Sequence, residues 1–110
     1  MPNLTFAATI NAVLFTGATP VILDIDEDSW GISASSIRNN ITSKTKAIVL
    51  VHLYGLIPDL ESILTIAEEN NLLVIEDCAE SLGSTFNGQM VGTFGDAAAF
   101  SFFGNKTITT

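Results

Sequence analysis

A lysine near the end of the chain and a pair of acidic residues before it are the groups that can do chemistry together. Lys106 is one of four basic residues in the sequence and follows the run 100–103, which is typical of a strand that ends in a turn. A lysine amine condenses with an aldehyde, and a carboxylate beside a pyridine nitrogen lets that ring accept electrons. Glu76 and Asp77 offer such a carboxylate. These residues predict a site for an aldehyde cofactor built on a pyridine ring.

Short apolar runs must supply the framework that positions these groups. The runs 21–25, 47–51 and 72–75 are continuous rather than alternating, which is typical of parallel strands covered on both faces. Residues 97–102 predict a further strand, and the glycine-punctuated segment before it predicts an irregular loop with a short hairpin.

Helices are expected between these strands. Residues 59–70 carry Leu60, Ile63, Leu64 and Ala67 on one stripe, with Pro58-Asp59 as a start signal. Two more helices are expected at 33–40 and 7–15. A strand, a helix and a parallel strand form a right-handed βαβ unit. The predicted fold class is therefore α/β with a mostly parallel sheet.

In open α/β sheets, ligands bind outside the carboxyl ends of the strands. Glu76 and Asp77 follow the run 72–75, so at least one of the two acids should project into that crevice. Ser101 lies at the far end of the last predicted strand, where a hydroxyl can donate to a phosphate. Each residue alone has an ordinary interpretation: a helix cap or surface acid, a strand-end hydrogen-bonder, and a solvated loop lysine for Lys106. Their combination favours a site.

Composition excludes several other classes of protein. The 110 residues allow one domain at most, and no apolar run approaches the roughly 20 residues of a membrane span. A net charge of −8 and the lack of a basic patch argue against a nucleic-acid partner. The lone Cys78 excludes an internal disulfide, fits a reducing cytoplasm and is expected to be a small buried residue. The 47% hydrophobic content indicates a fragment of a larger core, or one layer that expects covering partners, and the chain is expected to be part of a longer enzyme.

Eight stretches together cover most of the chain, namely 5–13, 17–21, 44–48, 51–55, 75–80, 92–96, 100–102 and 105–110. In order and spacing, these stretches resemble the DegT/StrS family of nucleotide-sugar aminotransferases that depend on pyridoxal phosphate (PLP). The similarity covers essentially the whole chain.

This resemblance implies a role for individual residues. Lys106 would bond covalently to the cofactor and later move a proton. Asp77 would form a salt bridge with the pyridinium nitrogen, Ser101 would bind the phosphate, and Phe6 would stack on the ring. An ordinary core phenylalanine is the alternative interpretation of Phe6.

Glu80 indicates a branch of the family. Members commonly carry Gln or His three residues after the aspartate, whereas perosamine synthases carry Glu. If the segment after Asp77 turns helically, Glu80 lies near the cofactor, and its role stays open. His52 is interpreted as a hydrogen-bonded structural histidine and Trp30 as a packing residue.

The resemblance also implies a fold and an activity. Residues 1–110 would be part of the three-layer large domain of an aspartate aminotransferase-like, fold type I enzyme, without its upstream segment and small C-terminal domain. The reaction would be amination of a nucleotide-linked 4-keto-6-deoxy sugar, with glutamate as donor. It would serve the synthesis of a deoxyaminosugar or of a surface polysaccharide such as lipopolysaccharide O-antigen. The full-length enzyme would be a cytoplasmic homodimer, and the isolated piece is expected to be inactive. The alternatives are another fold type I PLP enzyme that acts on an amino acid, and a catalytically inert PLP-binding chain.

Overall fold

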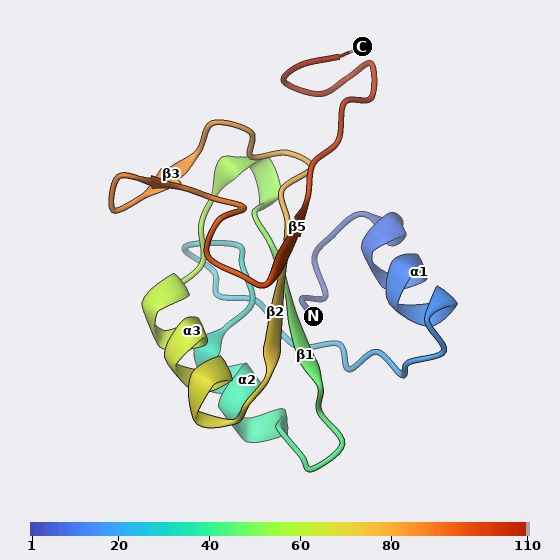
Figure 1. The fold of residues 1–110 in the computed structure, drawn as a ribbon, viewed down its shortest axis with the longest axis vertical. Helices are drawn as coiled ribbons and strands as arrows, with labels where there is room; N and C mark the ends of the chain where they lie inside the picture. Colours follow the sequence, from blue (N-terminus) through green and yellow to red (C-terminus); the bar gives the residue numbers. More distant parts are fainter. Residues whose placement is uncertain (110) are drawn as a thin grey trace.

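A computed structural model describes residues 1–109 and has a small parallel sheet at its centre (Figure 1). The sheet contains β1 (Ala47–Val51), β2 (Leu73–Asp77) and β5 (Ala97–Ala99), in that order, with both pairs of neighbours parallel. The predicted parallel α/β class is confirmed. Thr110, the last residue of the stretches that carry the family resemblance, lies outside the described residues.

Helices α2 (Ala34–Asn40) and α3 (Leu60–Glu69) cover one face of this sheet (Figure 1). Ser33 and Asp59 cap their first turns, each side chain accepting a hydrogen bond from a backbone N–H three residues on. The core lies between these helices and the sheet and is formed by the buried residues Ile32, Ile37, Ile48, Leu50, Leu60, Ile63, Ile66, Ala67 and Val74. Both helices were predicted to within a residue, although Leu64 of the predicted stripe is only partly buried and Ile66 takes the central place.

Helix α1 (Ala7–Phe15) lies on the other side of the sheet, beside β1 (Figure 1). Its bounds match the prediction. Of its nine residues, all within the described range, Thr9 alone is buried, while Phe15 is 90% exposed. The second face of the sheet is therefore only partly covered, which differs from the expectation for strands buried on both faces.

The glycine-punctuated segment contains the expected hairpin, formed by β3 (Thr85–Phe86) and β4 (Gln89–Met90). Asn87 and Gly88 connect the two strands with φ values of 50° and 81°. Asn-Gly is the dipeptide that most readily adopts two consecutive left-handed residues in a tight hairpin turn.

Three strand predictions are corrected. Residues 21–25 form no strand in the structure but two isolated bridges, Leu23 with Pro2 and Ile25 with Ile32. Their backbone groups bond to different neighbours in turn, so no continuous ladder forms. The strand predicted at 72–75 begins and ends later, at Leu73 and Asp77, because β1 pairs with it as far as Asp77.

The last strand is also shorter than predicted, ending at Ala99 rather than at residue 102. Its partner β2 ends at Asp77, which pairs with Ala99, so the residues that follow have no ladder to join. Within residues 1–109, no helix combines the length and the hydrophobicity that crossing a membrane requires.

Candidate active site

A cavity of about 1450 Å³ opens between α1 and the sheet and extends to the carboxyl ends of the strands. Its walls include apolar side chains of the sheet, among them Val49, Val51 and Ile75. The five residues assigned to the site from the sequence all line it, namely Phe6, Asp77, Glu80, Ser101 and Lys106.

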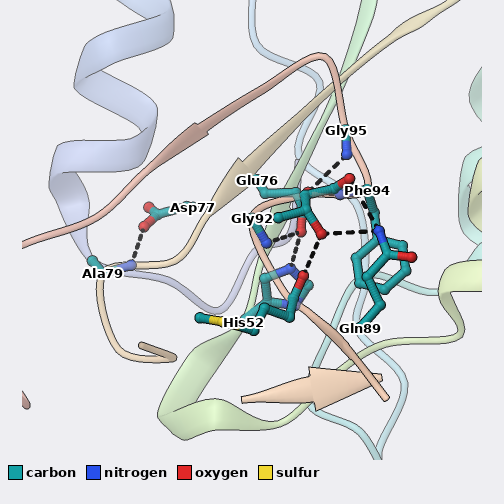
Figure 2. A network of polar contacts seen from close by, with 10 residues as sticks. His52, Glu76, Asp77, Ala79, Gln89, Gly92, Phe94 and Gly95 are labelled. Carbon is teal, nitrogen blue, oxygen red and sulfur yellow. Dashed lines mark hydrogen bonds and ion pairs between the residues drawn. The ribbon is translucent and has the colours of Figure 1, made fainter. Parts of the chain in front are cut away.

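Asp77 reaches the cavity because it is the last residue of β2, on the same side as Ile75. Its Oδ2 accepts a hydrogen bond of 2.7 Å from the Thr9 hydroxyl of α1. Its Oδ1 accepts one of 3.1 Å from the backbone N–H of Ala79 (Figure 2). The carboxylate is thus held by one donor on each oxygen, and each oxygen retains a lone pair for a further donor.

Lys106 is paired with Glu80. The Lys106 Nζ lies 3.3 Å from the Glu80 Oε1, and both side chains are largely buried, at 18% and 30% exposed. The Glu80 Oε2 accepts a hydrogen bond from the backbone N–H of Tyr54. Residues 78–83 form successive turns rather than a helix, yet they bring Glu80 to the same cavity as Asp77.

Ser101 and Phe6 line the cavity without strong partners in the protein. The Ser101 hydroxyl accepts a long hydrogen bond of 3.4 Å from the Phe103 N–H. Phe6 precedes the first turn of α1 and is 77% exposed, so it is not a core phenylalanine. A hydroxyl and an aromatic face are therefore available to a ligand.

Glu76 is fully buried and organises the loop between β4 and β5 (Figure 2). Its Oε1 accepts hydrogen bonds from the backbone N–H groups of Phe94 and Gly95, at 2.8 and 2.7 Å. Its Oε2 accepts from the Gly92 N–H at 2.7 Å and from the His52 Nε2 at 2.9 Å. Burial acts to raise the pKa of Glu76, but these four hydrogen bonds outweigh it and lower the pKa.

The loop 92–95 is shaped to make those contacts. Gly92 has φ +87°, and a Cβ on it would lie 2.5 Å from the Phe100 ring. A Cβ on Gly95 would lie 2.6 Å from the Val74 carbonyl oxygen of β2. The prediction that His52 is structural is confirmed, because it is fully buried against Glu76.

Cys78 is 1% exposed, as expected for a small buried residue. One donor atom each of His52, Glu76 and Cys78 lie within 4.8 Å of one another. Each Glu76 carboxylate oxygen already accepts two hydrogen bonds. Burial raises the pKa of the Cys78 thiol to about 11. This buried cluster does not suit a metal ion, which needs free lone pairs and a thiolate.

Sequence reasoning missed Thr9 and the structural role of Glu76. Thr9 could have been noticed as a hydroxyl among the apolar residues of helix 7–15. Its partner Asp77 lies 68 positions further along the chain, so local pattern does not reveal the contact. The signal for Glu76 was strand alternation, which places adjacent residues on opposite faces.

The residues around the cavity suit PLP. The chain supplies an amine, a carboxylate, a hydroxyl and an aromatic ring, which match the cofactor's aldehyde, pyridine nitrogen, phosphate and ring face. The cavity is large enough for a ligand of this size together with part of a substrate.

The fold and the site together indicate the class of protein. The chain is a parallel α/β part of a fold type I aminotransferase. The profile of the DegT/DnrJ/EryC1/StrS aminotransferase family matches residues 1–110, so the chain belongs to that family.

Three sugar-modifying enzymes are similar to the chain over all or nearly all of its length. The chain is 56% identical to the GDP-perosamine synthase of Escherichia coli O157:H7 and 51% identical to that of Caulobacter vibrioides, in each case over all of this chain and 30% of the relative. It is 48% identical to a UDP-N-acetyl-3-dehydro-alpha-D-glucosamine 3-aminotransferase of Acidithiobacillus ferrooxidans, over 98% of this chain and 29% of that protein. The chain thus spans about 30% of the length of the curated relatives it matches.

Solved structures agree. An aminotransferase from Psychrobacter cryohalolentis superposes with a TM-score of 0.95 at 44% identity, covering 98% of this chain and 27% of that one. NtdA from Bacillus subtilis, solved with the bound cofactor PMP, superposes with a TM-score of 0.91 at 38% identity, covering 99% of this chain and 24% of that one.

Proposed function

We propose that the chain is part of an enzyme that uses PLP to transfer an amino group from glutamate to the C4 ketone of a GDP-linked 4-keto-6-deoxy sugar. The observation that carries this proposal is the single cavity lined by Lys106, Asp77, Glu80, Ser101 and Phe6. Family membership supports the transfer of an amino group, and the relatives named GDP-perosamine synthase support the sugar.

Bound PLP supplies an aldehyde that carries the amino group and a ring that accepts electrons. Lys106 would hold the cofactor through its amine and would move a proton at the reacting carbon. It must be neutral to act as a nucleophile, and the Glu80 Oε1 at 3.3 Å is within reach to accept the proton that it gives up. Asp77 holds the pyridine nitrogen with its remaining lone pairs. Ser101 donates to the phosphate, and Phe6 covers one face of the ring.

Glu80 supports the perosamine branch of the family. It is the residue that the resemblance associates with that branch, and in this structure it links the Lys106 amine to the Tyr54 backbone. Relatives that act on UDP-linked and dTDP-linked sugars are 48% and 50% identical, so the nucleotide and the aminated carbon must be determined by assay.

The proposal extends to the whole protein. Residues 1–110 would belong to the PLP-binding large domain of a longer chain that contains an upstream segment and a small C-terminal domain. We propose a cytoplasmic homodimer that serves surface polysaccharide synthesis, such as that of O-antigen. One relative at 42% identity is named a spore coat polysaccharide biosynthesis protein.

The assay uses the purified full-length protein with PLP, glutamate and three nucleotide sugars. These are a GDP-linked 4-keto-6-deoxy sugar, a UDP-linked 3-keto sugar and a dTDP-linked 3-keto sugar. We expect mass spectrometry to detect the aminosugar with the first substrate, at a rate at least tenfold above the other two. Turnover of an amino acid and a keto acid without any sugar would instead favour another fold type I enzyme, and no turnover with bound PLP would favour the inert alternative.

A further inference from the structure

Helix α1 is attached to the rest of the described chain by a polar contact at its buried residue. Thr9 is 7% exposed, whereas Phe15 and Leu14 of the same helix are 90% and 51% exposed. The Thr9 hydroxyl lies 2.7 Å from the Asp77 carboxylate at the end of β2. The helix is therefore docked at the acid that the proposed function assigns to the pyridine nitrogen.

The direction of the hydrogen bonds in this contact follows from the groups involved. An ionised carboxylate accepts and cannot donate, so the single hydroxyl hydrogen of Thr9 goes to the Asp77 Oδ2. The Thr5 hydroxyl lies 2.9 Å from the Thr9 hydroxyl and must then be the donor in that pair. The chain Thr5 to Thr9 to Asp77 is continuous, and each hydrogen bond polarises the next.

Two fixed points determine how Asp77 is oriented. The Thr9 hydroxyl holds one oxygen, and the Ala79 N–H, at 3.1 Å, holds the other. Ala79 follows Asp77 by two residues and moves with it, whereas Thr9 belongs to a separate helix. Thr9 is thus the contact that fixes Asp77 relative to α1 and to Phe6, which precedes the first turn of that helix.

We propose that Thr9 is a positioning residue that orients Asp77 and sets its distance from Phe6, so that the two groups grip the pyridine ring together. This inference rests on the proposed function. It adds to that function a residue that acts through Asp77 rather than on the cofactor itself.

The test uses the full-length protein and three variants. Thr9→Val keeps the branched shape but removes the hydroxyl, and Thr9→Ser keeps the hydroxyl. Thr65→Val is the matched control, because the Thr65 hydroxyl bonds within α3 to the Glu61 carbonyl and is exposed. The dissociation constant of PLP and the absorption spectrum of the bound cofactor are measured by titration. Hydrogen exchange of residues 7–15 is measured without cofactor.

We expect Thr9→Val to weaken PLP binding about tenfold, as for the loss of a hydrogen bond to a charged group, and to shift the absorption maximum. Exchange in residues 7–15 should also become faster. Thr9→Ser should stay within about threefold of the unaltered protein, and Thr65→Val should match it. The inference is overturned if Thr9→Val binds PLP normally with an unchanged spectrum, or if Thr9→Ser is equally impaired.

Failure of the proposed function is distinguishable from failure of this inference. If the unaltered protein does not bind PLP, the proposed function fails, and hydrogen exchange alone then decides the role of Thr9. Unchanged exchange of residues 7–15 in Thr9→Val would overturn the docking of α1 through Asp77, whereas faster exchange would support it.

Discussion

Two adjacent acids, Glu76 and Asp77, have different roles because a strand turns successive side chains to opposite faces. Asp77 faces the cavity and retains free lone pairs, whereas Glu76 is buried and has two hydrogen bonds on each oxygen. The position of the two acids after an apolar run predicts that at least one of them reaches the crevice, without indicating which one. The family resemblance assigns that place to Asp77.

At the scale of single residues, the role of Lys106 can be tested by replacing it. In the full-length protein with PLP, Lys106→Ala should abolish the visible absorbance that arises when the lysine amine bonds to the cofactor. Ultraviolet–visible spectroscopy checks this result. Arg38→Ala is the control, since Arg38 forms an exposed ion pair with Glu69 and does not line the cavity, and it should leave the spectrum unaltered. An unchanged spectrum in Lys106→Ala would remove this lysine from the mechanism.

At the scale of elements, most of the framework is predictable from local pattern. Helix α1 and strand β1 have the predicted bounds, because each is a mostly apolar run with polar or turn-forming residues on at least one side. The run 21–25 looks like a strand but lacks a continuous partner, and pairing is not a local property. The contacts of Glu76 with loop 92–95 were not predictable either, since they join residues 16 to 19 positions apart through backbone groups.

Because Glu76 joins β2 to loop 92–95, the stability of the folded protein should depend on the ionisation of Glu76 and therefore on pH. Its pKa in the folded protein lies below the usual 4.5. Its contribution to the free energy of unfolding is therefore fully present above about pH 4.5 and is lost as the pH falls through the lowered pKa. Glu76→Gln should lower the free energy of unfolding by about 3 kcal/mol at pH 7, because the substitution leaves buried hydrogen-bond donors unsatisfied.

Urea unfolding of the full-length protein at pH 7 and at pH 3 measures this difference. The gap between Glu76→Gln and the unaltered protein should narrow at pH 3. The control is Glu69→Gln, which removes an exposed ion pair with Arg38 and should change stability by no more than about 0.5 kcal/mol. A gap of equal size at both pH values would show that the ionised carboxylate is not what holds the loop.

At the scale of the whole molecule, much apolar surface faces the cavity side of the sheet. Phe15 and Phe103 are 90% and 74% exposed, and apolar groups form most of the cavity wall. Exposed apolar surface of this extent is typical of an interface or of a face covered by other parts of a protein. The sequence indicates this surface through its hydrophobic content but not its location, which follows from the placement of α1.

The same apolar surface should affect how residues 1–110 behave when they are produced alone. Residues 1–110 produced alone should bind PLP weakly or not at all, and should self-associate through the uncovered face. PLP titration and light scattering check this, with the full-length protein as control. Tight, stoichiometric binding of PLP by residues 1–110 alone would contradict the prediction.

The alternation along β2 has a further consequence for how errors in folding are exposed. A slip of this strand by one residue would turn all of its side chains to the opposite faces of the sheet. In one direction, Asp77, whose side chain is one methylene shorter, would take the place of Glu76 beside the three loop amides, and Cys78 would take the place of Asp77 at the cavity. A chain with this register error would therefore lose the carboxylate at the cavity and the hydrogen bonds that hold loop 92–95 at the same time. A misregistered form would not keep one of these features without the other.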